Sequence, residues 1–317
     1  MIRLSTFLIL TFALLLSGCM QPYRGVEGTA FENLDYPFAV KKVTVLDGIE
    51  VAYADEGSGG TPLIFIHGLG SYLPAWLHAV NGLKDDYRCI AIDLPGYGKS
   101  DKGAYGYDMT FFSDAVVGVM DGLGLEEAVL VGHSMGGQIA MSVALRYPGR
   151  VERLVLAAPA GLEPFTEGEK QWFREVMTVD GVKLTPPQQI RANLTGNFYN
   201  MPESAEFMVT DRIAMRGAPD FEWYCYAVVR SVHGMVDEPV YEVLERITQP
   251  TLIVFGEHDN LIPNPYLHGG RSAEIGRIGL TRIPNSTLTM VEDAGHFVMF
   301  EKAGEFNTAV RSFLSQD

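Results

Sequence analysis

The sequence predicts an α/β fold with a mostly parallel central sheet, helices on both faces and an inserted helical cap. Short apolar runs of strand type alternate with amphipathic segments of helix length, which is the pattern of a parallel sheet covered by helices. The alternation stops at Pro159, and from residue 162 to 245 the composition is helical, without a convincing buried strand. The chain has 317 residues, of which 47% are hydrophobic and 20% charged, and this is enough to bury a large core.

The first predicted element is a hairpin, because Lys41–Leu46 and Ile49–Asp55 flank Asp47-Gly48, a two-residue turn signal. Four apolar runs follow that we predict as buried strands: Leu63–Ile66, Cys89–Ile92, Val129–Val131 and Val151–Ala157. Between them lie predicted helices at 74–83, 110–123 and 136–147. Beyond the cap the alternation resumes with a strand at Thr251–Phe255, a helix near 266–275, a strand near 287–291 and a final helix near 300–314.

The cap is predicted over residues 162–245, between the two parts of the core, 40–161 and 246–317. Pro186-Pro187 and several aromatic residues lie within it. An insertion beyond the carboxyl ends of the strands covers the crevice in which α/β sheets place ligands. We therefore expect the cap to contact the substrate. The alternative is a helical domain without a role in substrate binding.

The N-terminus reads as an export signal. Arg3 gives a positive start, and Leu4–Leu16 is an uncharged, mostly apolar run that is too short to span a bilayer but suits a signal-peptide core. The sequence Leu16-Ser17-Gly18-Cys19 resembles a bacterial lipobox, and this resemblance implies cleavage after residue 18 and lipidation of Cys19. The alternative is an ordinary signal peptide with an incidental cysteine.

On this interpretation residues 1–18 are a lipoprotein signal peptide and residues 19–39 a flexible tether. Two or more acyl chains anchor a protein stably at a membrane. The expected location is the bacterial cell envelope. The second mature residue is Met20 and not aspartate, and by resemblance to Gram-negative lipoproteins this favours the outer membrane.

The formal net charge of −15 makes nucleic-acid binding improbable, because such a surface repels phosphate backbones. It also repels anionic lipid head groups, so membrane attachment must come from the lipid anchor. The other two cysteines, Cys89 and Cys225, lie in apolar or aromatic contexts, and we expect them to be free buried thiols.

A nucleophile motif follows the apolar run Ala128–Val131. Gly132-His133-Ser134-Met135-Gly136 lies between this predicted strand and a predicted helix, which is the context that a G-x-S-x-G elbow requires. The turn is so sharp that side chains at the two glycine positions would clash. Ser134 is therefore the predicted nucleophile.

A serine hydroxyl needs a base, and His296 is the predicted one, because it follows the last predicted strand and precedes the last helix. The imidazole needs an acid partner, and Asp259, just past the strand Thr251–Phe255, completes the order Ser…Asp…His. Glu257 and Asp293 are the rival acids. His133 adjoins Ser134 but is expected to point away from it. Four other histidines stand in no sequence motif that supports a role as the base: His67, His78, His233 and His268.

The chain resembles the α/β-hydrolase superfamily, in particular its capped branch of esterases, lipases and carbon–carbon hydrolases. The resemblance runs from about residue 41 to the C-terminus and rests on these segments: His67-Gly68-Leu69-Gly70, residues 93–100, the elbow, Gly256-Glu257-His258-Asp259 and Gly295-His296. It implies that the backbone N–H groups of Leu69 and Met135 form an oxyanion hole.

No cofactor or metal is predicted. Gly98-Lys99-Ser100 resembles the end of a P-loop, but Asp93 stands where the first glycine is required. Gly68-Leu69-Gly70 begins a dinucleotide fingerprint, yet Leu73 replaces its last glycine. No spacing of histidines and cysteines suggests zinc.

The predicted activity is hydrolysis of a carboxylic ester through an acyl-enzyme, and the expected partner is a small-molecule, apolar ester substrate. The aromatic residues of the cap suit an apolar acyl or alcohol group. One alternative is a carbon–carbon bond hydrolase; such relatives often carry asparagine before the serine, whereas this chain has His133. The other is a non-catalytic surface lipoprotein that binds a ligand.

Overall fold

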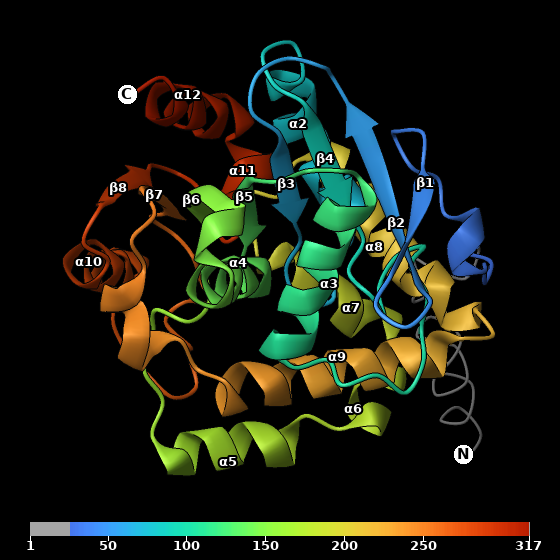
Figure 1. The fold of residues 1–317 in the computed structure, drawn as a ribbon. Helices are drawn as coiled ribbons and strands as arrows, with labels where there is room; N and C mark the ends of the chain where they lie inside the picture. The colour runs from blue at the N-terminus through green and yellow to red at the C-terminus, as the bar shows by residue number, and fades with distance from the viewer. Residues whose placement is uncertain (1–25, 317) are drawn as a thin grey trace, which may run out of the picture.

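The computed structural model describes residues 26–316. In this part of the chain, eight strands form one sheet in the order β1-β2-β4-β3-β5-β6-β7-β8 (Figure 1). The strand β2 is antiparallel to β1 and β4, and all other neighbours are parallel. The strands are β1 Lys41–Val45, β2 Ile49–Glu56, β3 Leu63–Ile66, β4 Cys89–Ile92, β5 Ala128–His133, β6 Val151–Ala157, β7 Thr251–Gly256 and β8 Ser286–Val291.

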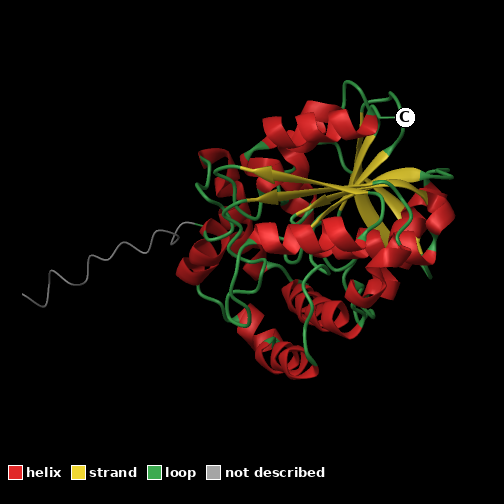
Figure 2. Ribbon diagram, turned by 90° about the vertical axis from the view of Figure 1, so that its left-hand side faces the viewer, coloured by secondary structure: helices red, strands yellow, loops and turns green. Residues whose placement is uncertain are grey.

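Helices cover both faces of the sheet (Figure 2). One face carries α3 Met109–Gly122, α4 Met135–Arg146 and α10 Ser272–Arg282, and the other carries α2 Leu77–Leu83, α11 Val298–Glu301 and α12 Ala303–Leu314. Successive residues of β3 enter opposite cores: Ile64 and Ile66 pack on the α3–α4 side, Leu63 and Phe65 on the α2–α12 side. The predicted fold class, an α/β sheet covered on both faces, is confirmed.

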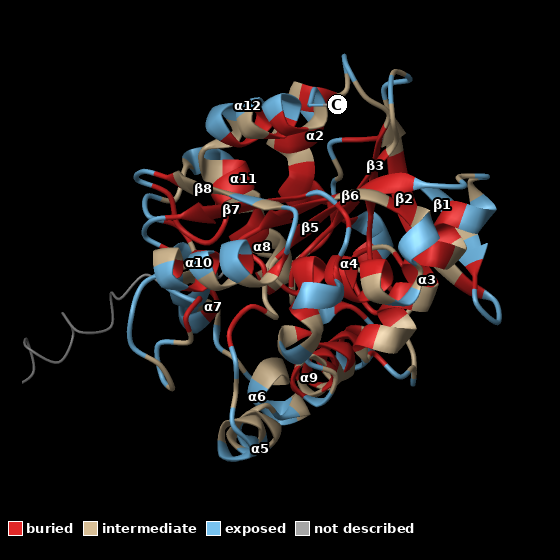
Figure 3. Cartoon of the chain, turned by 60° about the vertical axis from the view of Figure 1, so that its left-hand side comes forward, coloured by how far each residue is buried: buried red, intermediate tan, exposed pale blue. Residues whose placement is uncertain are grey.

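The cap segment lies between β6 and β7. Its helices are α5 Glu167–Val176, α6 Val179–Lys183, α7 Pro187–Thr195, α8 Glu206–Ala214 and α9 Phe221–Asp237. The arrow of β3 points toward the side on which α5, α6 and α9 lie, so these helices lie beyond the carboxyl ends of the strands (Figure 1). The helix α9 is mostly buried, whereas α5 and α6 on the outside contain no fully buried residue (Figure 3).

Two predicted elements differ from the structure. The hairpin loop contains three residues, 46–48, because Leu46 and Gly48 both adopt positive φ angles of 47° and 99° and β1 ends at Val45. The helix expected near 266–275 instead runs from Ser272 to Arg282. Pro263, Pro265 and the pair Gly269-Gly270 disfavour a helix before that point.

The N-terminal segment is also different. We expected a tether over residues 19–39, but Phe31 and Leu34 are buried in the main core and Val26 packs against a cap cluster centred on Ile190. Apolar side chains in this stretch are the reason, since each gains from burial. The predicted signal peptide and Cys19 lie outside the described residues.

Cys89 and Cys225 are free and buried, as expected. Burial raises the pKa of the Cys89 thiol to about 12 and that of Cys225 to about 11, which makes both thiols unreactive at neutral pH. Within residues 26–316, no helix has the length and apolarity needed to span a bilayer.

Candidate active site

The strand β5 ends in a strained turn. Ser134 has φ 53° and ψ −120°, a conformation that side chains rarely adopt. A Cβ atom at Gly132 would lie 2.3 Å from the Gly136 carbonyl oxygen, and one at Gly136 would lie 2.1 Å from that of Ile66. Glycine is therefore required at both positions, and the turn presents Ser134 at the carboxyl edge of the sheet.

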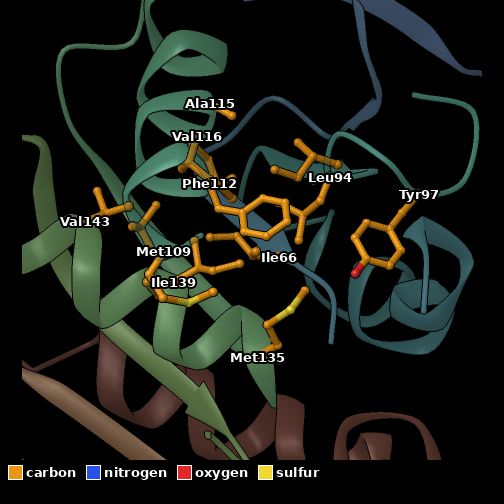
Figure 4. Packing of buried hydrophobic residues seen from close by; sticks show 14 of the residues in the cluster. Ile66, Leu94, Tyr97, Met109, Phe112, Ala115, Val116, Met135, Ile139 and Val143 are labelled. Carbon is orange, nitrogen blue, oxygen red and sulfur yellow. The ribbon is translucent and has the colours of Figure 1, made fainter. Parts of the chain in front are cut away.

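The helix α4 begins directly after this serine. The Met135 side chain belongs to the same buried hydrophobic cluster as Ile66, Phe112 and Ile139, and it fixes the first turn of the helix in the core (Figure 4). The Met135 N–H is one of the free donors at the helix N-terminus. Such donors and the helix dipole favour a negative charge next to Ser134.

His296 and Asp259 meet above the sheet edge. The Nδ1 atom of His296 lies 2.8 Å from Oδ2 of Asp259, and both side chains are almost fully buried. The other carboxylate oxygen, Oδ1, accepts from the backbone N–H groups of Leu261 at 2.8 Å and Ile262 at 3.1 Å. The carboxylate is thus held from two sides, and it can fix the tautomer of the imidazole.

Of the three acids considered, Asp259 is the one in contact with His296. Glu257 and Asp293 are both exposed to solvent. Asp293 lies in a left-handed turn with φ 51°, which faces it outward before the loop reaches His296.

The loop after β3 lies beside the elbow, with Gly68 so near that a Cβ there would lie 3.0 Å from the Ser134 Cβ. Neither the Leu69 N–H nor the Met135 N–H donates to a backbone carbonyl among residues 26–316. His67 fixes the start of this loop: Nε2 accepts from the Leu94 N–H at 3.0 Å, so Nδ1 carries the proton and donates to the Gly68 carbonyl at 2.8 Å. Burial lowers the pKa of His67 to about 4 and keeps it neutral.

Ser134 and His296 line the same cavity, of about 800 Å³, enclosed between the sheet edge and the cap. Most of its lining is apolar. Val176, Leu261 and Tyr266 line the cavity and are also 47%, 43% and 82% exposed, so they mark its mouth. Polar side chains on the wall include Tyr72, Gln138, Glu163, Lys170, Asn193, Arg212 and Tyr224.

Arg212 on α8 is the unusual polar group of the wall. Its guanidinium lies 4.5 Å from the centre of the Tyr224 ring. Its Nη1 atom is buried without a hydrogen-bond partner among residues 26–316. A buried cationic nitrogen without an acceptor favours an anionic ligand group at this end of the cavity.

Comparison with known families agrees with this geometry. Residues 61–303 match the family described as "alpha/beta hydrolase fold". This span contains Ser134, Asp259 and His296. The chain belongs to the α/β-hydrolase family. It is a hydrolase of that superfamily.

Curated relatives of this α/β-hydrolase include a 2-hydroxymuconate semialdehyde hydrolase from a Pseudomonas species, 30% identical, with 85% of this chain and 92% of that protein covered. The dihydrolipoyllysine-residue acetyltransferase component of the acetoin cleaving system from Cupriavidus necator is 29% identical over 85% of this chain. The chain spans 67% of the length of that component and 64% of its counterpart from Pseudomonas putida.

Solved structures similar to this α/β-hydrolase include a probable hydrolytic enzyme from Pseudomonas aeruginosa, with a TM-score of 0.81, 26% identity and coverage of 92% of this chain and 99% of that one. A thermophilic esterase from Thermogutta terrifontis has a TM-score of 0.69, 27% identity and coverage of 87% and 98%. A bacterial membrane phospholipase A has a TM-score of 0.72, 26% identity and coverage of 96% and 93%.

The sequence does not predict a role for His133, but the structure of this α/β-hydrolase places it in the site. It lines the cavity, its Nε2 lies 3.0 Å from the carbonyl oxygen of His296, and the two rings are 4.8 Å apart. Since that oxygen is an acceptor, Nε2 carries the proton. Burial, with His296 nearby, holds the pKa of His133 well below its usual range, so the ring stays neutral.

The sequence predicts no role for His268 either, but its side chain joins the cap to the loop that carries Asp259. Its Nδ1 contacts Glu163, and its Nε2 lies 3.1 Å from Glu169 at the start of α5. Glu163 also accepts from the Asn264 N–H at 2.8 Å. Partial burial by itself lowers the pKa of His268, but its hydrogen bonds to the two carboxylates outweigh this and the net pKa is raised. No local sequence signal marks this contact.

Proposed function

We propose that this protein is a serine hydrolase that cleaves a carboxylic ester, with Ser134 as nucleophile, His296 as base and Asp259 as acid. The observation that carries the proposal is the buried His296–Asp259 pair: His296 lines the same cavity as Ser134, a serine held in a strained turn at the end of β5. Strain of this kind persists where the surrounding structure enforces it, typically at a reactive residue.

In the proposed mechanism, the Nε2 atom of His296 takes the Ser134 proton as Oγ attacks the ester carbonyl carbon. The N–H groups of Leu69 and Met135 stabilise the oxyanion. His296 then gives the proton to the alcohol oxygen, the ester C–O bond breaks and an acyl-enzyme remains. Water, deprotonated by His296, attacks the acyl carbon. The bond to Ser134 Oγ then breaks, His296 returns the proton to Oγ, and the carboxylic acid leaves.

The cavity supports an apolar ester as substrate. Its lining is mostly apolar and its mouth is bordered by the exposed side chains of Val176, Leu261 and Tyr266. The similar structure named as an esterase supports the same reaction class. No cofactor is needed in this mechanism.

A second candidate is hydrolysis of a carbon–carbon bond. The relative named for 2-hydroxymuconate semialdehyde supports it, because that compound contains no ester bond. Arg212 supports it as well, since a substrate carboxylate would pair with its buried Nη1 atom. His133 before the serine, in place of the asparagine frequent in such relatives, favours the ester.

A substrate panel separates the two candidates. With p-nitrophenyl esters of increasing acyl length, we expect kcat/KM to rise about fourfold for each added methylene, since each buried methylene contributes roughly 0.8 kcal/mol. Arg212→Met should cost less on these neutral esters than on 2-hydroxymuconate semialdehyde. If the wild type cleaves the semialdehyde faster than every ester, and Arg212→Met removes that activity, the second candidate replaces the first.

We further propose that the mature protein begins at a lipidated Cys19 in the bacterial cell envelope, at the outer membrane in a Gram-negative cell. The lipobox-like sequence supports this. Val26, a few residues after Cys19, packs on cap residues. The seven residues 19–25 reach at most about 25 Å. A lipid at Cys19 therefore keeps the cap close to the membrane, next to apolar substrates.

Cys19→Ser tests this location. We expect the variant to leave the membrane fraction or to remain unprocessed. Its kcat on a soluble ester should stay within about twofold of the wild type, because Cys19 has no role in the proposed mechanism. Mass spectrometry of the wild-type N-terminus is the decisive measurement. An unmodified terminus at any other residue would exclude the anchor.

A further inference from the structure

The cap makes a hydrogen bond to the loop that follows β3. Tyr224 on α9 is 1% exposed, and its hydroxyl donates to the carbonyl oxygen of Gly70 at 3.0 Å. Gly70 has φ 67°, so the chain turns there and presents this carbonyl to the cap. A buried tyrosine hydroxyl needs a partner, and here the partner is a backbone group next to Leu69.

Two peptide groups connect this hydroxyl to the Leu69 N–H. The Gly70 carbonyl and the Ser71 N–H belong to one peptide group, and the Ser71 N–H donates to the Gly68 carbonyl at 3.2 Å. The Gly68 carbonyl and the Leu69 N–H belong to a second peptide group. In a trans peptide the two polar bonds point in opposite directions. Hydrogen bonds that hold the Gly68 carbonyl therefore also fix the direction of the Leu69 N–H, which points to the opposite side of the peptide group.

Both ends of the loop are fixed by residues of the core. His67 donates to the same Gly68 carbonyl, and the Asp93 carboxylate accepts from the Leu73 N–H at 2.6 Å. The second cap contact, from the Tyr72 hydroxyl to Asp211 on α8 at 2.6 Å, involves a residue of the loop itself. Gly70 thus lies between core contacts on both sides, and Tyr224 supplies the cap contact at Gly70 itself.

We propose that Tyr224 is a positioning residue for the oxyanion hole. Resting on the serine-hydrolase mechanism proposed above, the hydroxyl of Tyr224 orients and polarises the Leu69 N–H through the two peptide groups. Hydrogen bonds in a chain strengthen one another, so a donor at the Gly70 carbonyl makes the Leu69 N–H a better donor to the oxyanion. The cap then takes part in transition-state stabilisation as well as in substrate enclosure.

Tyr224→Phe removes the hydroxyl and keeps the ring that lies beneath Arg212. We expect kcat on a soluble ester to fall about tenfold with KM little changed. This is less than the roughly 10²–10³-fold cost of losing a whole oxyanion-hole donor. Affinity for a trifluoromethyl ketone, which adds Ser134 to form a tetrahedral oxyanion, should fall by the same factor as kcat/KM.

Tyr97→Phe is the matched control. Tyr97 is also fully buried, and its ring lies 5.8 Å from that of Tyr224. Its hydroxyl contacts Ser231 on α9, the helix that carries Tyr224, at 2.8 Å. The substitution Tyr97→Phe removes a comparable buried hydrogen bond, but among the described residues no chain of hydrogen bonds leads from this hydroxyl to the Leu69 N–H. We expect both variants to lose similar thermal stability, and only Tyr224→Phe to lose ketone affinity.

Two results would overturn the proposal in an active enzyme. One is an unchanged kcat and ketone affinity in Tyr224→Phe; the other is an equal loss of both in Tyr97→Phe, which would indicate a general loosening of the cap. Failure of the serine-hydrolase proposal itself appears differently, because the wild type would then neither hydrolyse the ester nor form the ketone adduct.

Discussion

Replacement of Ser134 by alanine is expected to lower kcat for ester hydrolysis by about 10⁴–10⁶-fold. The reason is that the variant has no oxygen at the position from which the acyl-enzyme forms. The backbone at Ser134 lies in a conformation that is unfavourable for serine and alanine alike, so folding should be unaffected. Steady-state kinetics of the purified variant, with the thermal midpoint measured alongside, test both parts.

Two further variants sharpen this test. Ser113→Ala removes another buried serine hydroxyl, which donates to the Met109 carbonyl and contacts the Ser142 hydroxyl. None of these residues lines the cavity, so this variant should retain near wild-type kcat. Ser134→Gly should be as inactive as Ser134→Ala but more stable, because glycine tolerates φ 53° without the strain, a difference of about 1 kcal/mol. If Ser134→Ala keeps a tenth of the activity, the nucleophile lies elsewhere.

Asp259→Asn is expected to lower kcat by about 10⁴-fold. The Leu261 and Ile262 N–H groups both donate to Oδ1, so the asparagine oxygen must occupy this position. Its NH2 group then faces Nδ1 of His296. An imidazole that must accept at Nδ1 carries its proton on Nε2 and cannot take the proton of Ser134. The effect should therefore appear in kcat, while the fold is retained.

The rival acids are the controls for Asp259→Asn. Glu257→Gln and Asp293→Asn remove exposed carboxylates that do not contact His296. Each should change kcat by less than about threefold, since exposed charges act weakly through solvent. A loss of activity in either of them that exceeds the loss in Asp259→Asn would show that the acid has been assigned wrongly.

The sheet and the elbow could be predicted from the sequence because their signals are local. Apolar runs such as Leu63–Ile66 and Val151–Ala157 coincide with the observed strands, and the glycines of the elbow are required by close backbone contacts. The pairing of His296 with Asp259 was predicted from the order Ser…Asp…His and from the position of each residue after a predicted strand.

The contacts around that edge could not be predicted in the same way. His133 reaches the carbonyl of His296, and Tyr224 reaches that of Gly70, across 163 and 154 positions of the chain. Both contacts depend on how the cap and the loops pack, and no periodicity or motif in the sequence predicts this packing. The N-terminal segment was misjudged for a related reason: Phe31 and Leu34 gain partners only once the fold has formed.

Labelling with a fluorophosphonate tests the central claim most directly, because this reagent phosphonylates a serine that is activated by a neighbouring base. The purified protein is treated with the reagent, digested, and analysed by mass spectrometry, with Ser134→Ala and Asp259→Asn in parallel. We expect one adduct, on the peptide that contains Ser134, formed together with loss of ester hydrolysis, absent from Ser134→Ala and much slower in Asp259→Asn. Full inhibition with the adduct on another residue, or ester hydrolysis that continues after Ser134 is fully labelled, would contradict the account.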